Sequence, residues 1–286
     1  MSINNDKIEE SLHLTLRKYW GYSEFRPGQE AIIRSVVQGR DTLALMPTGG
    51  GKSLTYQVPT LAREGLCIVF TPLIALMKDQ VDRLKNMGIN AVAIHLGLSY
   101  SKIDIALDNC VYGDVKFLYV APERLATEAF RLRVQRMNVS LLAVDEAHCI
   151  SQWGHDFRPA YRRISDLRQL FPDVPVLALT ATATPEVVED IQRQLGFREN
   201  NCHSMSFERK NLAYVVRRTE NKQQELLHIL GRIEGSAIII RRTGKRPRRY
   251  RTSFLPTASQ PTIIMQASLS RVRISRKRHG RAERYV

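Results

Sequence analysis

The sequence predicts an α/β fold in which a central, mostly parallel β-sheet is flanked by helices. Short β-branched and apolar runs alternate with amphipathic stretches up to about residue 240, as expected where each strand is followed by a helix. A Gly-rich segment carrying Lys52 follows the first of these runs, and an acidic pair at Asp145 and Glu146 ends a later one. Both features are typical of the carboxyl edge of a parallel sheet, where ligands gather.

The expected strands share a short, apolar, β-branched character, and they lie at 42–45, 66–71, 91–95, 116–120, 141–145, 176–180, 213–217 and 236–240. Helices are expected between them. Apolar residues recur at helical spacing from Leu73 to Leu84, and Gly88 is a natural C-terminal stop. Pro185 suits the first turn of a later helix.

Length, charge and cysteines exclude several classes of protein. The 286 residues allow one large domain or two modest ones. Four scattered cysteines without C-x-x-C spacing indicate neither a zinc site nor a disulfide framework, and reduced thiols fit a cytoplasmic protein. A polar N-terminus and the lack of about eighteen consecutive apolar residues predict no signal peptide and no membrane span.

The net charge of +15 comes almost entirely from the last part of the chain. Residues 241–286 hold fourteen Lys and Arg against one acidic residue, whereas residues 1–240 carry a net charge of only +2. The basic segment is rich in Ser, Thr and Arg and has no period that would build a core, so it is predicted to be disordered. Any binding of nucleic acid is expected to be mostly nonspecific and to come from this tail.

The segment 46–53 has the composition of a phosphate-binding loop. Glycines let backbone N–H groups approach a triphosphate, Lys52 reaches the β- and γ-phosphates, and the Ser53 hydroxyl ligates Mg²⁺. Met46 stands where the strict pattern has its first Gly, and a coincidental Lys-Ser pair in a Gly-rich loop is the alternative. The predicted ATP-binding residues of this loop are Thr48, Gly49, Gly50, Gly51, Lys52 and Ser53.

Asp145, Glu146 and His148 follow an apolar run in the order Asp-Glu-Ala-His. Asp145 is expected to hold Mg²⁺ and Glu146 to orient and deprotonate the attacking water. His148 is expected to couple this site to a second one. Lys52, Asp145, Glu146 and His148 are therefore the predicted catalytic residues; the alternative is a solvated strand end.

A polar, Gly-containing loop with two aromatic residues comes directly after these carboxylates. Aromatic faces stack on bases and Arg pairs with phosphate, so the loop is predicted to contact nucleic acid, although a cluster of helix-packing aromatics is the alternative. Thr hydroxyls after the 176–180 strand offer a bridge between the two sites. The residues predicted to bind DNA or couple it to hydrolysis are Trp153, His155, Phe157, Arg158, Thr180 and Thr182.

The chain resembles the RecQ family of superfamily 2 DNA helicases from about residue 12 to residue 240. The resemblance is carried, in the family's order, by segments 20–29, 46–53, 71–80, 119–125, 145–148, 152–158 and 180–183. Met46 is the family's usual residue at that position. By resemblance, Tyr22, Arg26 and Gln29 contact adenine, and His148 links hydrolysis to DNA.

The resemblance implies an ATP- and Mg²⁺-dependent enzyme that unwinds DNA in the 3′→5′ direction during recombination and repair. Residues 1–207 are expected to form an ATP-binding RecA-like lobe, 208–240 the start of a second lobe, and 241–286 the basic tail. The family's arginine-finger motif and cysteine-rich zinc module do not occur in this sequence.

This difference predicts that truncation within the second lobe impairs the chain. The abrupt change after residue 240, from balanced charge to an Arg-rich segment, predicts that the tail is an out-of-frame product, and a genuine regulatory tail is the alternative. A non-motor nucleotide- or DNA-binding fragment, or a decayed product, is the alternative function. A P-loop kinase or GTPase would leave the Gln29 segment and the Asp-Glu-Ala-His run unexplained.

Overall fold

The computed structural model describes residues 2–154, 156–208, 212–232, 237–241, 263–267, 277–278 and 281–282. The chain divides into two compact units, Met1–Arg209 and Lys210–Val286.

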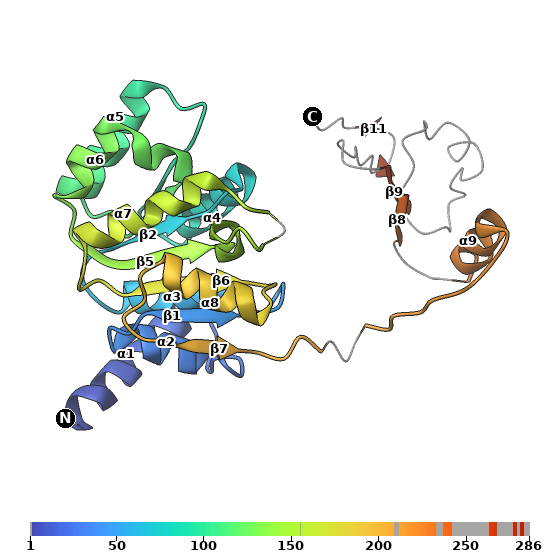
Figure 1. The fold of residues 1–286 in the computed structure, drawn as a ribbon, viewed down its shortest axis with the longest axis horizontal. Helices are drawn as coiled ribbons and strands as arrows, with labels where there is room; N and C mark the ends of the chain where they lie inside the picture. Colours follow the sequence, from blue (N-terminus) through green and yellow to red (C-terminus); the bar gives the residue numbers. More distant parts are fainter. Residues whose placement is uncertain are drawn as a thin grey trace. The chain divides into compact units, whose positions relative to one another are not determined.

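A seven-stranded sheet forms the centre of the first unit (Figure 1). Its strands lie in the order β3-β4-β2-β5-β6-β1-β7, and all neighbouring pairs are parallel. They are β1 (Thr42–Leu45), β2 (Leu66–Phe70), β3 (Ala91–Ile94), β4 (Phe117–Val120), β5 (Val139–Asp145), β6 (Val176–Thr180) and β7 (Cys202–Ser204). This sheet confirms the predicted α/β class.

Helices connect and cover the strands of the first unit. The α-helices are α1 (Ser2–Trp20), α2 (Gln29–Val37), α3 (Lys52–Leu61), α4 (Ile74–Asn86), α5 (Tyr100–Tyr112), α6 (Glu128–Val134), α7 (Arg163–Leu170) and α8 (Pro185–Gln194). Short 3₁₀ turns are η1 (Pro122–Ala126), η2 (Ala147–Ile150) and η3 (Pro159–Arg162). Helix α8 begins at Pro185 as predicted, and the Thr184 hydroxyl caps it by accepting a hydrogen bond from the Val187 N–H.

Both faces of the sheet are buried, which explains why its strands are continuous apolar runs. In β2, Ile68 and Phe70 join one core with residues of α5 to α8. The intervening Cys67 and Val69 join a second core with residues of α2, α3 and α4. Because a charged side chain finds no place on either buried face, Asp145 lies at the end of its strand.

The predicted strands of this sheet agree with the observed ones to within two residues, with two exceptions. The strand predicted at 213–217 is wrong: residues 212–219 have no regular secondary structure, and Tyr214 and Val216 are 90% and 92% exposed. A β-branched run is stable as a strand only when a neighbour pairs with it, and no pairing involves this segment in the described part of the chain. Strand β7 was not predicted because it is short, polar and at the sheet edge.

The second unit contains α9 (Lys222–Leu230) and two small ladders. Strand β8 (Ala237–Arg241) lies within a residue of the predicted strand and pairs in parallel with β9 (Ile263–Ala267). Strands β10 (Lys277–Arg278) and β11 (Arg281–Ala282) pair antiparallel. The remaining residues of the tail predicted to be disordered lie outside the described residues. Within the described part of the chain, no helix has both the length and the apolar character of a bilayer span.

Candidate nucleotide and coupling site

The loop between β1 and α3 has a backbone that requires glycine. Gly49 and Gly51 have φ angles of 81° and 80°, in the left-handed region that glycine adopts without strain. A Cβ atom on Gly50 would lie 2.9 Å from the Pro47 carbonyl oxygen. Gly51 is the N-cap of α3 and provides no capping side chain, so the first N–H groups of the helix face the loop as donors for an anion. Lys52 and Ser53 begin this helix.

Arg26 and Gln29 hold this loop from the side. The Gln29 amide nitrogen donates to the carbonyl oxygens of Gly50 and Gly51, at 3.0 and 3.3 Å. The Arg26 guanidinium donates to the Gly49 carbonyl at 2.8 Å, and the Arg26 main-chain N–H donates to the Gln29 side-chain oxygen at 3.0 Å. Gln29 is buried whereas Tyr22 is 51% exposed. The adenine contact of these residues stays a prediction, and the structure adds that two of them brace the phosphate loop.

Asp145 ends strand β5 at the same edge of the sheet. Burial and the neighbouring Glu146 carboxylate raise the pKa of Asp145 to about 6, and Lys52 acts in the opposite direction. The charge of Lys52 therefore reaches Asp145. A carboxylate and a hydroxyl, from Asp145 and Ser53, are the hard oxygen donors that Mg²⁺ takes in proteins, so the predicted magnesium ligands fit the ion.

The raised pKa gives a prediction for Asp145→Asn in the absence of Mg²⁺ and nucleotide. The folded protein holds this proton to a higher pH than the unfolded chain, so ionisation of Asp145 lowers the free energy of unfolding progressively between about pH 4 and about pH 6, and the loss is complete above that range. We expect the substitution to raise that free energy by about 1–3 kcal/mol near pH 7 and by progressively less as the pH falls toward 4. Urea denaturation across this range measures it, with the exposed Asp82→Asn as control. An equal gain at both ends would contradict the titration of Asp145.

Glu146 and His148 lie next to each other on the turn that follows β5. The His148 Nδ1 atom is 2.9 Å from the Thr180 hydroxyl oxygen and 3.3 Å from a Glu146 carboxylate oxygen. The Thr180 hydroxyl in turn accepts a hydrogen bond from the Thr182 N–H at 3.3 Å. The structure thus joins the end of β5 to the end of β6 through these side chains, and it brings residues of the predicted catalytic group, Glu146 and His148, against Thr180 of the predicted coupling group.

The loop after η2 presents its aromatic residues in two different ways. Trp153 is 77% exposed, whereas Phe157 is half-buried under the Arg162 guanidinium, 5.2 Å from the ring centre. Arg158 forms an ion pair of 3.1 Å with Asp156, which leaves Trp153 as the most open stacking surface of the group. His155 lies outside the described residues.

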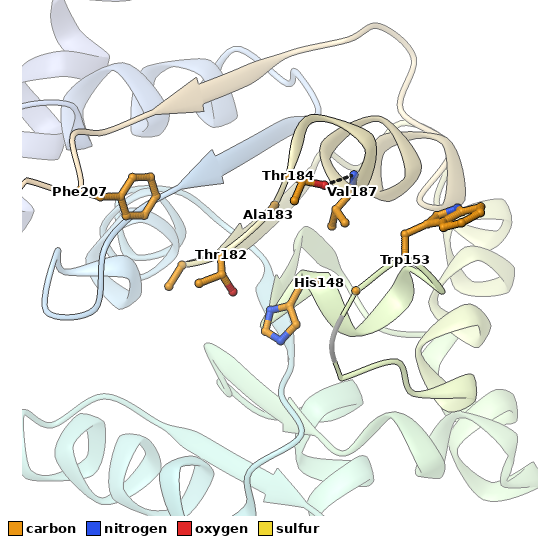
Figure 2. A pocket seen from close by; sticks show the side chains of 9 residues that line it. His148, Trp153, Thr182, Ala183, Thr184, Val187 and Phe207 are labelled. Carbon is orange, nitrogen blue, oxygen red and sulfur yellow. Dashed lines mark hydrogen bonds between the residues drawn. The ribbon is translucent and has the colours of Figure 1, made fainter. Parts of the chain in front are cut away.

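A cavity of about 510 Å³ lies between this loop and the segment after β6 (Figure 2). Its lining is mainly small and apolar, with His148 on one side; the residues are His148, Trp153, Gly154, Ala181, Thr182, Ala183, Thr184, Val187 and Phe207. A Cβ atom on Gly154 would lie 2.6 Å from the His148 carbonyl oxygen, so only glycine lets the loop pass this close to the turn. Thr184, Val187 and Phe207 belong to none of the predicted motifs, so the sequence did not predict them at this cavity.

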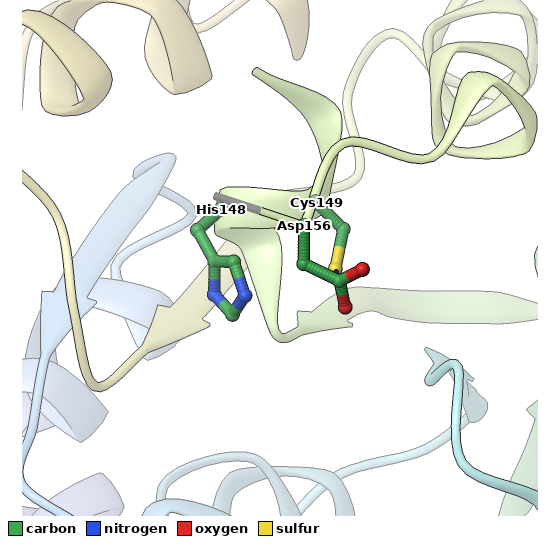
Figure 3. A group of neighbouring side chains, drawn as sticks. All are labelled: His148, Cys149 and Asp156. Atoms are coloured by element: carbon green, nitrogen blue, oxygen red, sulfur yellow. Dashed lines mark hydrogen bonds between the residues drawn. The ribbon is translucent and has the colours of Figure 1, made fainter. Parts of the chain in front are cut away.

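Three side chains of metal-ligand type gather where the η2 turn meets the loop that follows it (Figure 3). Ligand atoms of His148, Cys149 and Asp156 all lie within 4.8 Å of one another. However, Asp156 is paired with Arg158, and burial and the Asp156 carboxylate raise the pKa of the Cys149 thiol to about 12. The protonated thiol donates to Asp156 at 3.8 Å, so this group joins the loop to the turn by a polar contact.

The part of the chain that carries the candidate site is similar to known proteins. The DEAD/DEAH box helicase family matches residues 26–191. The ATP-dependent DNA helicase RecQ of Bacillus subtilis is 50% identical over 73% of this chain, and that of Pasteurella multocida 42% over 78%. The chain spans 36% of the length of each, about a third.

Solved structures share the fold. The DUF1998 helicase MrfA superposes with a TM-score of 0.60 at 17% identity, over 85% of this chain and 39% of that one. A hypothetical ATP-dependent RNA helicase from Sulfolobus tokodaii superposes with a TM-score of 0.55 at 16% identity, over 90% of this chain and 82% of that one.

Proposed function

The chain belongs to the DEAD/DEAH box helicase family and is a RecQ-type member over about three quarters of its length, and we propose that it acts as an ATP-dependent 3′→5′ DNA helicase. The observation that carries the proposal is the meeting of three features at one edge of the sheet. These are the glycine loop before Lys52, the Asp145–Glu146 pair, and the contact from His148 to Thr180.

In this proposal the phosphates of ATP lie in the loop and at the N-terminus of α3, with Lys52 against the β- and γ-phosphates. Ser53 and Asp145 hold Mg²⁺, which when bound neutralises charge on the phosphate oxygens. Glu146 orients a water molecule on the γ-phosphate and accepts its proton. Tyr22, Arg26 and Gln29 contact adenine. To do so, the Gln29 amide exchanges its hydrogen bonds to the phosphate loop for hydrogen bonds to adenine.

We propose that DNA binds the coupling loop, residues 152–158. Exposed Trp153 and the half-buried Phe157 and Arg158 offer stacking and phosphate contacts, and His155 belongs to the same run. Through the contacts of His148 with Thr180 and Glu146, a change at this loop reaches the hydrolytic carboxylate. In this proposal residues 1–207 are the ATP-binding lobe and residues 208–240 are the start of a second lobe. The protein is cytoplasmic and binds DNA in that compartment.

The test is ATP hydrolysis with and without single-stranded DNA, in the parent and in Glu146→Gln. The substitution removes the base but keeps the shape of the side chain, so we expect Mg²⁺·ATP binding to persist. Turnover is expected to fall by about a hundredfold, the usual contribution of a positioned general base. Phosphate release measures turnover, and a fluorescent nucleotide measures binding.

The matched control is Glu10→Gln, an exposed glutamate on α1, which should leave turnover unchanged. Equal turnover in the parent and in Glu146→Gln would refute the assignment of the base. Nucleotide binding without any hydrolysis by the parent would instead favour a non-motor nucleotide-binding protein.

A further inference from the structure

The peptide group between Asp145 and Glu146 is held from both of its ends. Its carbonyl oxygen accepts a hydrogen bond of 3.0 Å from the Tyr161 hydroxyl. Its N–H donates, also at 3.0 Å, to the Asp145 carboxylate. Because a peptide group is planar, these two bonds fix its orientation, and the Tyr161 hydroxyl provides the bond that comes from another element.

Glu146, directly after this peptide, has φ 49° and ψ 46°. It is the single non-glycine residue with a positive φ in the part of the chain that the structure describes. The left-handed conformation is unfavourable for a residue with a Cβ atom and persists only when the surroundings enforce it. Rotating the Asp145–Glu146 peptide by about half a turn would bring φ of Glu146 to a negative value. That rotation is what the Tyr161 hydrogen bond opposes.

Tyr161 is placed by the coupling loop. It lies in η3, directly after the loop, and is 0% exposed. Its N–H donates to the Arg158 carbonyl at 3.0 Å, and the Arg158 N–H donates to the Cys149 carbonyl at 2.8 Å. The C-terminal end of the loop is therefore hydrogen-bonded to η2. The buried Tyr161 hydroxyl connects this end of the loop to the Asp145 carbonyl.

We propose that Tyr161 is a positioning residue, whose hydroxyl holds the Asp145–Glu146 peptide in the orientation that aims the Glu146 carboxylate. This inference rests on the proposed role of Glu146 as the base. It also gives the loop a second route to the hydrolytic site, through the main chain, beside the side-chain contacts of His148. A displacement of the segment from Arg158 to Tyr161 weakens the hold on the peptide and changes the direction of the carboxylate.

An ordinary core tyrosine would use the nearest carbonyl merely to satisfy its hydroxyl. The two roles differ in what Tyr161→Phe does. Phenylalanine keeps the ring in the core and removes one oxygen atom. For a purely structural residue, stability falls while turnover per folded molecule stays the same. For a positioning residue, the peptide rotates and kcat falls.

The experiment compares Tyr161→Phe with Ser35→Ala. Ser35 is also fully buried, and its hydroxyl lies 2.8 Å from that of Thr42. Thr42 begins β1, at the opposite end of this strand from the phosphate loop. Both variants are measured for unfolding midpoint, KM for ATP and kcat, and the crystal structure of Tyr161→Phe is determined. We expect kcat of Tyr161→Phe to fall about a hundredfold, the effect of a small misplacement of a catalytic group. KM should stay near the parent value, and φ of Glu146 should become negative. Ser35→Ala should lose stability and keep kcat.

A Tyr161→Phe structure that retains the positive φ at Glu146 overturns the inference, as does a kcat equal to that of Ser35→Ala. If the parent hydrolyses no ATP, the proposed function fails, and the crystal structure alone then decides the inference. A negative φ at Glu146 in the variant supports the hold by Tyr161, and a positive φ rejects it.

Discussion

Replacing Lys52 with alanine is expected to abolish productive binding of Mg²⁺·ATP. Lys52 is the first residue of α3, where the helix N-terminus and the glycine loop converge. The nearby Arg26 guanidinium donates to the Gly49 carbonyl and so braces the loop. Lys52 and the β- and γ-phosphates form a charge pair in the proposed complex. Removing one member of such a pair costs about 2–5 kcal/mol, or thirtyfold to several thousandfold in affinity.

Asp145→Ala should have a similar effect by another route, because it removes the carboxylate proposed to hold Mg²⁺. The loss of nucleotide affinity should appear with Mg²⁺ present and should shrink when the nucleotide is titrated without the ion. A fluorescent ATP analogue measures both variants, and Lys85→Ala, an exposed lysine on α4, is the control. If affinity is unchanged in both Lys52→Ala and Asp145→Ala, the nucleotide does not bind in this loop.

The sequence was sufficient to predict the sheet and the residues gathered at its edge because both depend on local patterns. Strands buried on both faces must be apolar, and polar residues directly after them must lie where the strands end. The positions of Lys52, Asp145 and Thr180 follow from these two constraints. Residue type and order then indicate a phosphate and magnesium site.

The remaining features of the site depend on contacts between distant segments. The residues from Asp145 to His148 do not predict the left-handed conformation of Glu146, because this conformation depends on the Tyr161 hydroxyl, fifteen residues later in the chain. Phe207 reaches the cavity from beyond the last recognised motif. The strand predicted at 213–217 shows the opposite case, in which a favourable local pattern has no partner among the described strands.

The edge of the sheet opposite the candidate site is held by a buried ion cluster around Asp41. This residue precedes β1, and its side chain is 0% exposed. Its two carboxylate oxygens accept hydrogen bonds from the Val176 and Arg198 main-chain N–H groups, at 2.9 and 3.0 Å. They also accept from the guanidinium groups of Arg168 and Arg198, each at 3.0 Å. One side chain thus ties β1 to β6, to α7 and to the segment leading to β7.

Asp41→Ala is therefore expected to be among the most destabilising single substitutions in the first unit. It leaves two main-chain donors without their acceptor and leaves the Arg168 guanidinium, only 9% exposed, without its countercharge. Breaking a buried pair in this way costs about 3–5 kcal/mol, a large part of the 5–15 kcal/mol typical of a folded domain. Urea denaturation monitored by Trp fluorescence measures the loss.

Arg34→Ala is the matched control, because Arg34 pairs with Glu9 and Glu30 at 3.0 Å on the exposed surface of α2. Such surface pairs contribute at most about 1 kcal/mol, so the two substitutions should differ severalfold in the free energy that they remove. Asp41→Asn separates the causes: its oxygen can still accept one main-chain hydrogen bond, but its charge is gone, so a loss close to that of Asp41→Ala assigns the stability to the ion pairs. Unfolding midpoints of Asp41→Ala and Arg34→Ala that coincide would show that the cluster does not hold this edge of the sheet together.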